Sequence, residues 1–324
     1  TPPGVLEAVR RGLPQLHRYP DPYCRQLVQA IAAHEQVPAS YVLCGNGAAD
    51  LIYAYCAALR PRTAVEPAPT FAEYGLGLAQ VGCRVAPYFL HQAENFDLDG
   101  GFLLFLEEKK PEVVFLCTPN NPTGRLLPLP LLEQILQVCA AWGALVFLDE
   151  CFLDLTEGGV SARSLLAAHP ELLILKAFTK SYGMAGIRLG YCLCADNALL
   201  RHMASASQPW NVSSLAQSAG VAALAERDFL QRTLALVRKE RRWLTDNLMA
   251  LGFWVCPSQA NYLLFRGPWG LREGLLRRGI AIRGCGNYNG LDDGWYRIAV
   301  RPHEENEALI TAIRQFCEEK SLWQ

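Results

Sequence analysis

Short apolar runs alternate with helical patterns along residues 44–195, and this alternation restricts the possible folds more than any other feature of the sequence. Gly, Pro or Asn lies close to each run, and the runs are residues 63–66, 84–89, 112–117, 144–148, 172–176 and 189–194. Unbroken apolar strands suit a mainly parallel sheet that is covered on both faces. The sequence therefore predicts an α/β domain with its sheet sandwiched by helices.

The pattern changes after Trp210. Two long helical patterns come first and a strand–helix–strand–strand–helix order follows, at residues 213–225, 229–251, 261–265, 271–278, 280–283, 295–300 and 304–319. This order predicts a compact α+β lobe, and the first ~25 residues are expected to pack with it. We predict a large domain at 28–212, and a small domain with a connecting long helix at 1–27 and 213–324.

The charge balance argues against several classes of partner. With 30 basic and 31 acidic residues, the chain has a formal net charge of −1, which favours neither nucleic acid nor an anionic membrane. The six histidines show no ligand spacing, so no metal site is predicted, and the 12 dispersed cysteines indicate free thiols. No apolar run reaches transmembrane length and no signal peptide is recognised, so we expect a cytoplasmic protein.

One lysine, Lys180, lies in a run of small and polar residues after a predicted strand. Residues 177–183 read Ala-Phe-Thr-Lys-Ser-Tyr-Gly, and Arg188 follows eight positions after the lysine. A lysine that forms a Schiff base with a cofactor needs such a part-buried place at a rigid strand exit. Arg188 could reach a cofactor phosphate and lower the pKa of the lysine. The alternative is a surface lysine in a glycine-rich loop.

Polar residues also follow two other predicted strands. The loop Pro-Asn-Asn-Pro-Thr-Gly places Asn121 where open α/β sheets bind ligands, although an ordinary Pro/Asn turn is the alternative. Asp149 follows the apolar run 145–148 and could keep a pyridine nitrogen protonated, or it could cap a helix. Its neighbour Glu150 is expected to point away. Residues 45–50 precede an apolar helix and could leave backbone N–H groups free for a phosphate.

This ordered set of phosphate loop, Asn, Asp and Lys resembles the fold-type I pyridoxal-phosphate (PLP) enzymes, in the class I/II aminotransferase branch. The likeness spans nearly the full chain and includes residues 18–21, 70–74, 116–124, 208–212, 260–264, 282–288 and 296–300. The resemblance implies a seven-stranded sheet and pyridoxal 5′-phosphate as the cofactor. It also implies a homodimer.

The resemblance assigns a role to each candidate residue. Lys180 would hold the cofactor as a Schiff base, Asp149 would contact its pyridine nitrogen and Asn121 its phenolic oxygen. Phe71 would stack on the ring. The phosphate would be surrounded by Gly47, Ala48, Thr179 and Arg188, with Tyr19 reaching across from the partner subunit. Arg283 and Arg297 would bind the anionic groups of the substrate, with Asn121 beside them.

Two positions depart from the family pattern. Phe152 stands where many relatives carry a tyrosine that helps to hold the phenolic oxygen, so Asn121 is expected to bear more of that role. Ala177 stands where relatives usually carry a serine or threonine phosphate ligand, which leaves Thr179 and Arg188 to compensate. Family members also carry a segment before the equivalent of Thr1 that closes over the substrate.

The resemblance implies a phosphorylated amino acid as the substrate. The expected reaction is decarboxylation of L-threonine O-3-phosphate to (R)-1-amino-2-propanol O-2-phosphate in cobalamin biosynthesis. An aminotransferase of the histidinol-phosphate type is the alternative, because the same cofactor residues serve both reactions. A non-catalytic PLP-binding module is a more remote alternative, since no helix-turn-helix segment is recognised.

Overall fold

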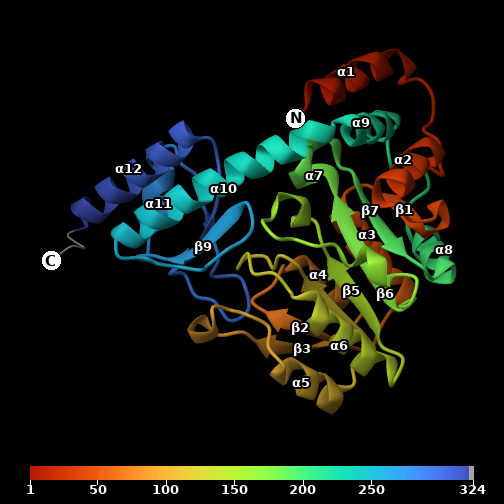
Figure 1. The fold of residues 1–324 in the computed structure, drawn as a ribbon, viewed down its shortest axis with the longest axis horizontal. Helices are drawn as coiled ribbons and strands as arrows, with labels where there is room; N and C mark the ends of the chain where they lie inside the picture. Colours follow the sequence, from red (N-terminus) through yellow and green to blue (C-terminus); the bar gives the residue numbers. More distant parts are fainter. Residues whose placement is uncertain (321–324) are drawn as a thin grey trace.

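The computed structural model describes residues 1–320 and contains two sheets, and a long helix, α10, runs diagonally from beside the smaller sheet toward the larger one (Figure 1). The larger sheet has seven strands in the order β1-β7-β6-β5-β4-β2-β3. Their bounds are Val42–Gly45 for β1, Thr63–Ala68 for β2, Arg84–Phe89 for β3, Val113–Cys117 for β4, Leu145–Asp149 for β5, Leu172–Ala177 for β6 and Gly190–Cys194 for β7. The six predicted strands of this region are confirmed, and β1 is additional.

The direction of the strands matches the mainly parallel sheet that the sequence predicts. Strands β3, β2, β4, β5 and β6 are parallel, whereas β7 is antiparallel to both of its neighbours, β6 and β1. Every residue of β4, β6 and β7 is buried. Strands that are buried on both faces read as continuous apolar runs, which is why these strands were recognisable in the sequence.

Helices cover both faces of this sheet (Figure 1). Because alternate side chains of a strand point to opposite faces, Val114 and Val146 join one apolar cluster, while Phe115 and Phe147 join the other. The first cluster receives side chains from α2 (Arg25–Glu35), α5 (Gly101–Lys109), α6 (Leu129–Ala140) and α9 (Ser214–Ala225). The second receives them from α3 (Ala48–Leu59), α4 (Glu73–Gln80) and α8 (Asn197–Ala206).

The smaller sheet is antiparallel and has the order β10-β11-β9-β8. Its strands are β8 (Trp254–Val255), β9 (Tyr262–Arg266), β10 (Arg283–Gly284) and β11 (Trp295–Ala299), and its helices are α10 (Arg227–Ala250), α11 (Leu271–Leu276) and α12 (His303–Glu319). The predicted strand at 280–283 is reduced to the two residues of β10. Among the described helices, none has both the length and the apolar character needed to cross a membrane.

The first helix, α1 (Pro3–Gly12), packs on α9. Both helices, however, bury their apolar residues in the core of the large sheet. Val5 of α1 and Ala216 and Ala219 of α9 belong to the same cluster as Val146 of β5. This packing differs from the expected association of residues 1–25 with the C-terminal lobe. The division at residues 28 and 213 stays a prediction.

The close packing of α9 generates a prediction about Gly220. A Cβ atom at this residue would lie 2.6 Å from Cδ2 of Leu189 and 2.7 Å from Cδ1 of Leu27. Ala normally stabilises a helix relative to Gly by about 1 kcal/mol, but overpacking a core costs about 1–3 kcal/mol. We therefore expect Gly220→Ala to lower the free energy of unfolding, measured by chemical denaturation. The control is Gly75→Ala in α4, where the nearest atom is 3.6 Å from the added Cβ; an equal loss there would contradict the prediction.

Candidate active site

Three of the predicted site residues come together because β4, β5 and β6 are neighbours in the sheet. Asp149 is the last residue of β5, Asn121 follows β4, and Lys180 lies in the short helix α7 (Phe178–Ser181) that directly follows β6. The carboxyl ends of parallel strands meet at one edge of a sheet, which is where open α/β folds bind ligands. The structure therefore brings these residues to one edge, in the strand order that the sequence indicated.

Asp149 is buried and held by two hydrogen bonds. Its Oδ1 accepts the backbone N–H of Cys151 at 2.8 Å, and its Oδ2 accepts the hydroxyl of Tyr74 at 2.6 Å. Burial raises the pKa of Asp149, while these hydrogen bonds and the Lys180 ammonium act to lower it. The role of Tyr74 was not recognised in the sequence. Tyr74 lies in the stretch 70–74 that carries the family resemblance, and its side chain is buried in the core.

Lys180 has a lowered pKa. Desolvation of the ammonium group by the surrounding protein is the largest cause, the positive charges of Arg297 and Arg188 add to it, and Asp149 opposes it, although the residue as a whole is exposed and not part-buried as expected. The Nζ atom lies 5.4 Å from the centre of the Phe152 ring. A lowered pKa leaves more of the amine unprotonated near neutral pH, as a nucleophilic lysine requires. The expected effect of Arg188 on Lys180 is thus present, although desolvation contributes more.

The predicted phosphate loop lies between β1 and α3, with Arg188 against it. Gly47 has a φ of +87°, and a Cβ atom there would lie 2.7 Å from Nη2 of Arg188. Gly190 is equally restricted, because its Cβ would meet the backbone nitrogen of Ala48 at 2.8 Å. Free N–H groups at a helix start, together with a guanidinium group, suit an anion. The structure therefore places Gly47, Ala48 and Arg188 close together, while their role toward a phosphate stays a prediction.

Arg283 and Arg297 are directly opposite one another on the antiparallel strands β10 and β11. Residues in this relation point to the same face, with Cβ atoms about 5 Å apart, and like charges there repel. Among residues 1–320, neither guanidinium group forms an ion pair with a carboxylate. Two positive charges held side by side favour binding of an anionic ligand.

Asn121 joins this arginine pair to the large sheet. Its Oδ1 accepts a hydrogen bond from Nη1 of Arg297 and another from the hydroxyl of Tyr288 at 3.2 Å. The Arg297 guanidinium lies 5.3 Å from the ring centre of Tyr262, and that of Arg283 lies 5.7 Å from the ring centre of Tyr288. The roles of these two tyrosines were not assigned from the sequence, although both lie in the stretches that carry the family resemblance.

A cavity of about 540 Å³ opens between the two sheets beside these groups. Lys180 and Phe152 line it from the side of the large sheet, and Tyr262, Arg283 and Arg297 from the side of the small one. It is large enough for a small-molecule ligand. An amine of lowered pKa and two guanidinium groups thus face one space.

The remaining predicted residues lie around this centre or apart from it. Phe71 packs edge-on against Tyr74 at 5.5 Å, and so lies near Asp149. Thr179 is half-buried directly before Lys180. Tyr19 lies at the surface, 82% exposed, with its ring 5.1 Å from that of Trp210. It is not brought to the cavity within a single chain.

Comparison with known proteins shows which family has this arrangement. The model of the family described as "Aminotransferase class I and II" matches residues 1–313. The chain belongs to this family. It is 39% identical to threonine-phosphate decarboxylase of Salmonella typhimurium over 319 residues, 97% of this chain and 87% of that protein. It is 32% identical to histidinol-phosphate aminotransferase of Symbiobacterium thermophilum over 318 residues, 96% and 86% of the two chains.

The fold comparison agrees with the family. The structure of histidinol-phosphate aminotransferase from Clostridium acetobutylicum matches with a TM-score of 0.91 and 26% identity, covering 98% of this chain and 96% of that one. The predicted fold class and the resemblance to class I/II aminotransferases are confirmed. The two departures from the family pattern are Phe152, whose ring lies beside Lys180, and Ala177, which is the buried last residue of β6.

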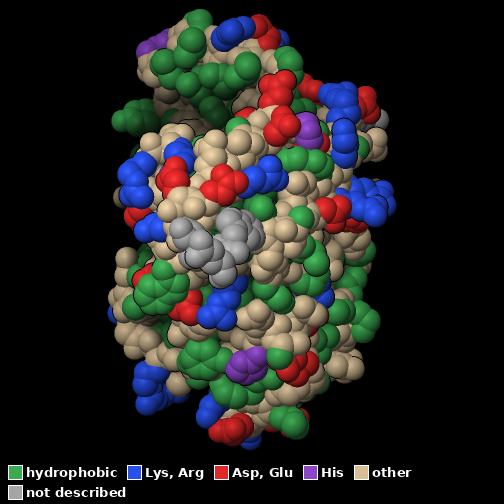
Figure 2. Space-filling model, turned by 90° about the vertical axis from the view of Figure 1, so that its left-hand side faces the viewer, with side chains coloured by type: hydrophobic (Ala, Val, Ile, Leu, Met, Phe, Trp, Pro, Cys, Tyr) green, Lys and Arg blue, Asp and Glu red, His purple; other side chains and the backbone are tan. Residues whose placement is uncertain are grey.

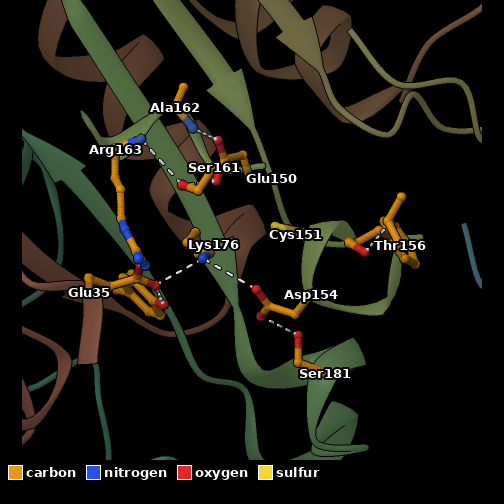
Figure 3. Close-up of polar contacts among 12 residues, drawn as sticks. Glu35, Glu150, Cys151, Asp154, Thr156, Ser161, Ala162, Arg163, Lys176 and Ser181 are labelled. Atoms are coloured by element: carbon orange, nitrogen blue, oxygen red, sulfur yellow. Dashed lines mark hydrogen bonds and ion pairs between the residues drawn. The ribbon is translucent and has the colours of Figure 1, made fainter. Parts of the chain in front are cut away.

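Glu150 points away from this family site, as the sequence analysis expected. Its carboxylate accepts the hydroxyl of Ser161 at 2.7 Å and the backbone N–H of Ala162 at 2.8 Å (Figure 3). Burial raises the pKa of Glu150 to about 7, against the attraction of the Lys176 ammonium and these hydrogen bonds. Glu150 is therefore part of the scaffold behind the site.

The raised pKa of Glu150 predicts a pH-dependent cost to stability. Between its ordinary pKa of 4.5 and about 7, the folded protein holds a proton that the unfolded chain has lost, so stability falls as pH rises through this range. Glu150→Gln keeps a hydrogen-bonding side chain without the charge. As pH rises from 5 to 8, the unsubstituted protein should lose stability that the variant keeps. The difference in free energy of unfolding between the two proteins should therefore shift in favour of the variant by on the order of 2 kcal/mol. Chemical denaturation at both pH values measures this, and the exposed Glu94→Gln, which should show no such gain, is the control.

Proposed function

We propose that this protein binds pyridoxal 5′-phosphate and decarboxylates L-threonine O-3-phosphate to (R)-1-amino-2-propanol O-2-phosphate, as expected from the sequence. The arginine pair carries the proposal, because a substrate with both a phosphate and a carboxylate can use two adjacent guanidinium groups. The similarity to threonine-phosphate decarboxylase of Salmonella typhimurium supports the same substrate. The chemistry of the reaction would belong to the cofactor.

The residues at the sheet edge fit the cofactor. Its phosphate would lie at the start of α3 with Arg188, where Gly47 leaves space that a Cβ atom would fill. Its pyridine nitrogen would lie against Asp149, whose burial makes a cationic partner favourable. Lys180 would hold its aldehyde carbon through Nζ, and Asn121 would contact its phenolic oxygen. When bound, the cofactor supplies an electron sink for the electron pair released at Cα.

The side chains of this protein then have three tasks. Arg283 and Arg297 would bind the carboxylate and the phosphate, and so orient the bond between Cα and the carboxylate for cleavage. With the substrate held in this way, that bond would break and CO₂ would leave. Lys180, by then free, donates a proton from Nζ to Cα, for which its lowered pKa is suited.

Transamination is the second candidate function, supported by the 32% identity to a histidinol-phosphate aminotransferase. It would require the Cα–H bond, and not the Cα–carboxylate bond, to be the one that breaks, with Lys180 taking the proton. The two functions differ in what they consume. Decarboxylation needs no oxo-acid acceptor, whereas transamination converts 2-oxoglutarate to glutamate.

An assay with L-threonine O-3-phosphate tests the proposed function. We expect release of CO₂ and aminopropanol phosphate from the PLP-loaded protein without any oxo-acid. Lys180→Ala should reduce this rate by at least about 10³-fold, because it removes the group that holds the cofactor and moves the proton. Glutamate formation that depends on 2-oxoglutarate, without CO₂ release, would contradict decarboxylation.

The arginine pair is tested in the same assay. Loss of a charged hydrogen bond to a substrate anion costs about 2–3 kcal/mol, so Arg283→Gln and Arg297→Gln should each raise KM by more than about tenfold. Arg266→Gln is the matched control. Arg266 lies on the same sheet but is near Asp292, at 3.7 Å, and does not line the cavity.

We also propose that the protein is a homodimer in which Tyr19 reaches the cofactor phosphate of the partner subunit. Class I aminotransferases are typically homodimers, and Tyr19 lies at the surface of a single chain. Apolar side chains gather over α1 at one end of the molecule (Figure 2), and those exposed there include Leu6, Leu13 and Leu16. Burial of such a patch favours association with a second copy.

A mixing experiment tests the shared site. Tyr19→Phe should weaken PLP binding by about tenfold, since one hydrogen bond to a charged group is lost. A heterodimer of Tyr19→Phe with Lys180→Ala contains one site with both native residues. Activity of the mixed and re-associated variants should therefore exceed the sum of the separate ones. A simple sum, together with a monomeric mass by light scattering, would contradict the shared site.

A further inference from the structure

A group of charged side chains surrounds a lysine of β6 and reaches Ser181, the residue next to Lys180 (Figure 3). Its centre is Lys176, which is 4% exposed and lies on β6 four residues before Lys180. The Lys176 Nζ atom is 2.9 Å from Oε1 of Glu35 and 3.3 Å from Oδ1 of Asp154. Neither the family comparison nor the proposed mechanism gives these residues a role.

Glu35 closes one end of the group. It is fully buried at the end of α2, and its carboxylate also contacts Nη1 of Arg163 at 3.0 Å and accepts the hydroxyl of Tyr191. Burial acts to raise the pKa of Glu35, but the Lys176 ammonium and these hydrogen bonds outweigh it and hold the pKa at about 2. Glu35 is therefore charged at neutral pH and fixes the Lys176 ammonium in place.

Asp154 forms the other end and connects the group to the helix that carries Lys180. It lies in the 3₁₀ turn η4 (Leu153–Leu155), and its Oδ2 accepts the hydroxyl of Ser181 at 2.8 Å. Ser181 directly follows Lys180 in α7. The side-chain contacts thus form a continuous path from Glu35 through Lys176 and Asp154 to the residue beside Lys180.

The helix α7 needs support of this kind. It has only four residues, its first turn has no side-chain cap, and a single turn of helix is unfavourable by itself. Gly183, with a φ of +62°, follows within two residues of its end. The hydrogen bond from Ser181 to Asp154 therefore attaches the end of α7 to a part of the protein that is fixed by buried ion pairs.

We propose that Asp154 is a positioning residue for Lys180, which it holds in the cavity through Ser181 while the Lys176–Glu35 pair holds Asp154. This inference rests on the proposed role of Lys180 in binding the cofactor. Asp154 is expected to act through position, because its carboxylate contacts the Ser181 hydroxyl and the Lys176 ammonium, and not the amine of Lys180 itself. Removing the contact should let the amine move toward water and away from the arginines.

The test measures Lys180 in the protein without cofactor. A small aldehyde is added at a series of pH values, the imine is trapped with borohydride, and labelling of Lys180 is read by peptide mass spectrometry. We expect the apparent pKa of Lys180 to rise by about one unit in Ser181→Ala and in Asp154→Ala, because the amine becomes better solvated. The double variant should show no larger rise than Asp154→Ala, since both substitutions break the same hydrogen bond between Ser181 and Asp154.

The control is Ser161→Ala, which removes a serine hydroxyl bonded to the neighbouring buried carboxylate, Glu150, at 2.7 Å. Like Ser181→Ala, this substitution removes one hydrogen bond from a serine to a buried or half-buried carboxylate. Ser161 does not belong to α7, so the pKa of Lys180 should stay unchanged. An unchanged pKa in folded Ser181→Ala, or an equal rise in Ser161→Ala, would overturn the inference. If Asp154→Ala does not fold, as judged by circular dichroism, Ser181→Ala decides alone.

A second measurement separates this inference from the proposed function. In the PLP-loaded protein, Ser181→Ala should lower kcat for L-threonine O-3-phosphate by about tenfold, with KM within about twofold, because substrate-binding arginines are untouched. If the unsubstituted protein releases no CO₂, the proposed function fails, while the labelling experiment still reports on Asp154. If CO₂ is released and the variants label like the unsubstituted protein, only the positioning role fails.

Discussion

The site depends on the in-register pairing of three parallel strands, β4, β5 and β6. Asp149 at the end of β5 is paired with Cys117 of β4 on one side and Leu175 of β6 on the other. Because these strands are buried on both faces, a shift in register would move apolar side chains out of both cores. The hydrophobic pattern of the strands therefore fixes the positions at which Asn121 and Lys180 leave the sheet, on either side of Asp149.

The same strand geometry separates two adjacent acids into different roles. Asp149 accepts a hydrogen bond from Tyr74 on one side of the sheet, whereas Glu150 accepts hydrogen bonds from Ser161 and Ala162 on the other side. Burying either carboxylate is costly, and the hydrogen-bond donors of each offset only part of that cost, so that the pKa of both stays raised. Lys176 is the positive charge that acts on Glu150, whereas Lys180 is the one that acts on Asp149. Arg188 and Arg297 lie near Lys180 and lower its pKa. The two groups of charges share β6 and the short helix α7.

Local patterns explain what the sequence predicts well. The strands of the large sheet are apolar runs with polar residues at their ends. Their positions along the chain, and the candidates Asn121, Asp149 and Lys180 that follow them, can therefore be recognised in the sequence. The two-residue strands β8 and β10 are too short to show a pattern, and β10 was placed too early. Contacts between distant segments were also missed. Tyr74 with Asp149, and Glu35 with Lys176, are partners only once the sheet has formed.

Asn121 shows how a contact between the two sheets sharpens a role that the sequence left open. The sequence suggested that its amide contacts a cofactor oxygen, but did not say which amide atom would do so. In the structure, Arg297 and Tyr288 both donate to Oδ1, so the acceptor of the amide is occupied and Nδ2 remains as the donor. A phenolic oxygen requires a donor, so this orientation is the productive one. Because Arg297 is also a proposed ligand of the substrate anion, anion binding and the orientation of Asn121 depend on the same guanidinium group.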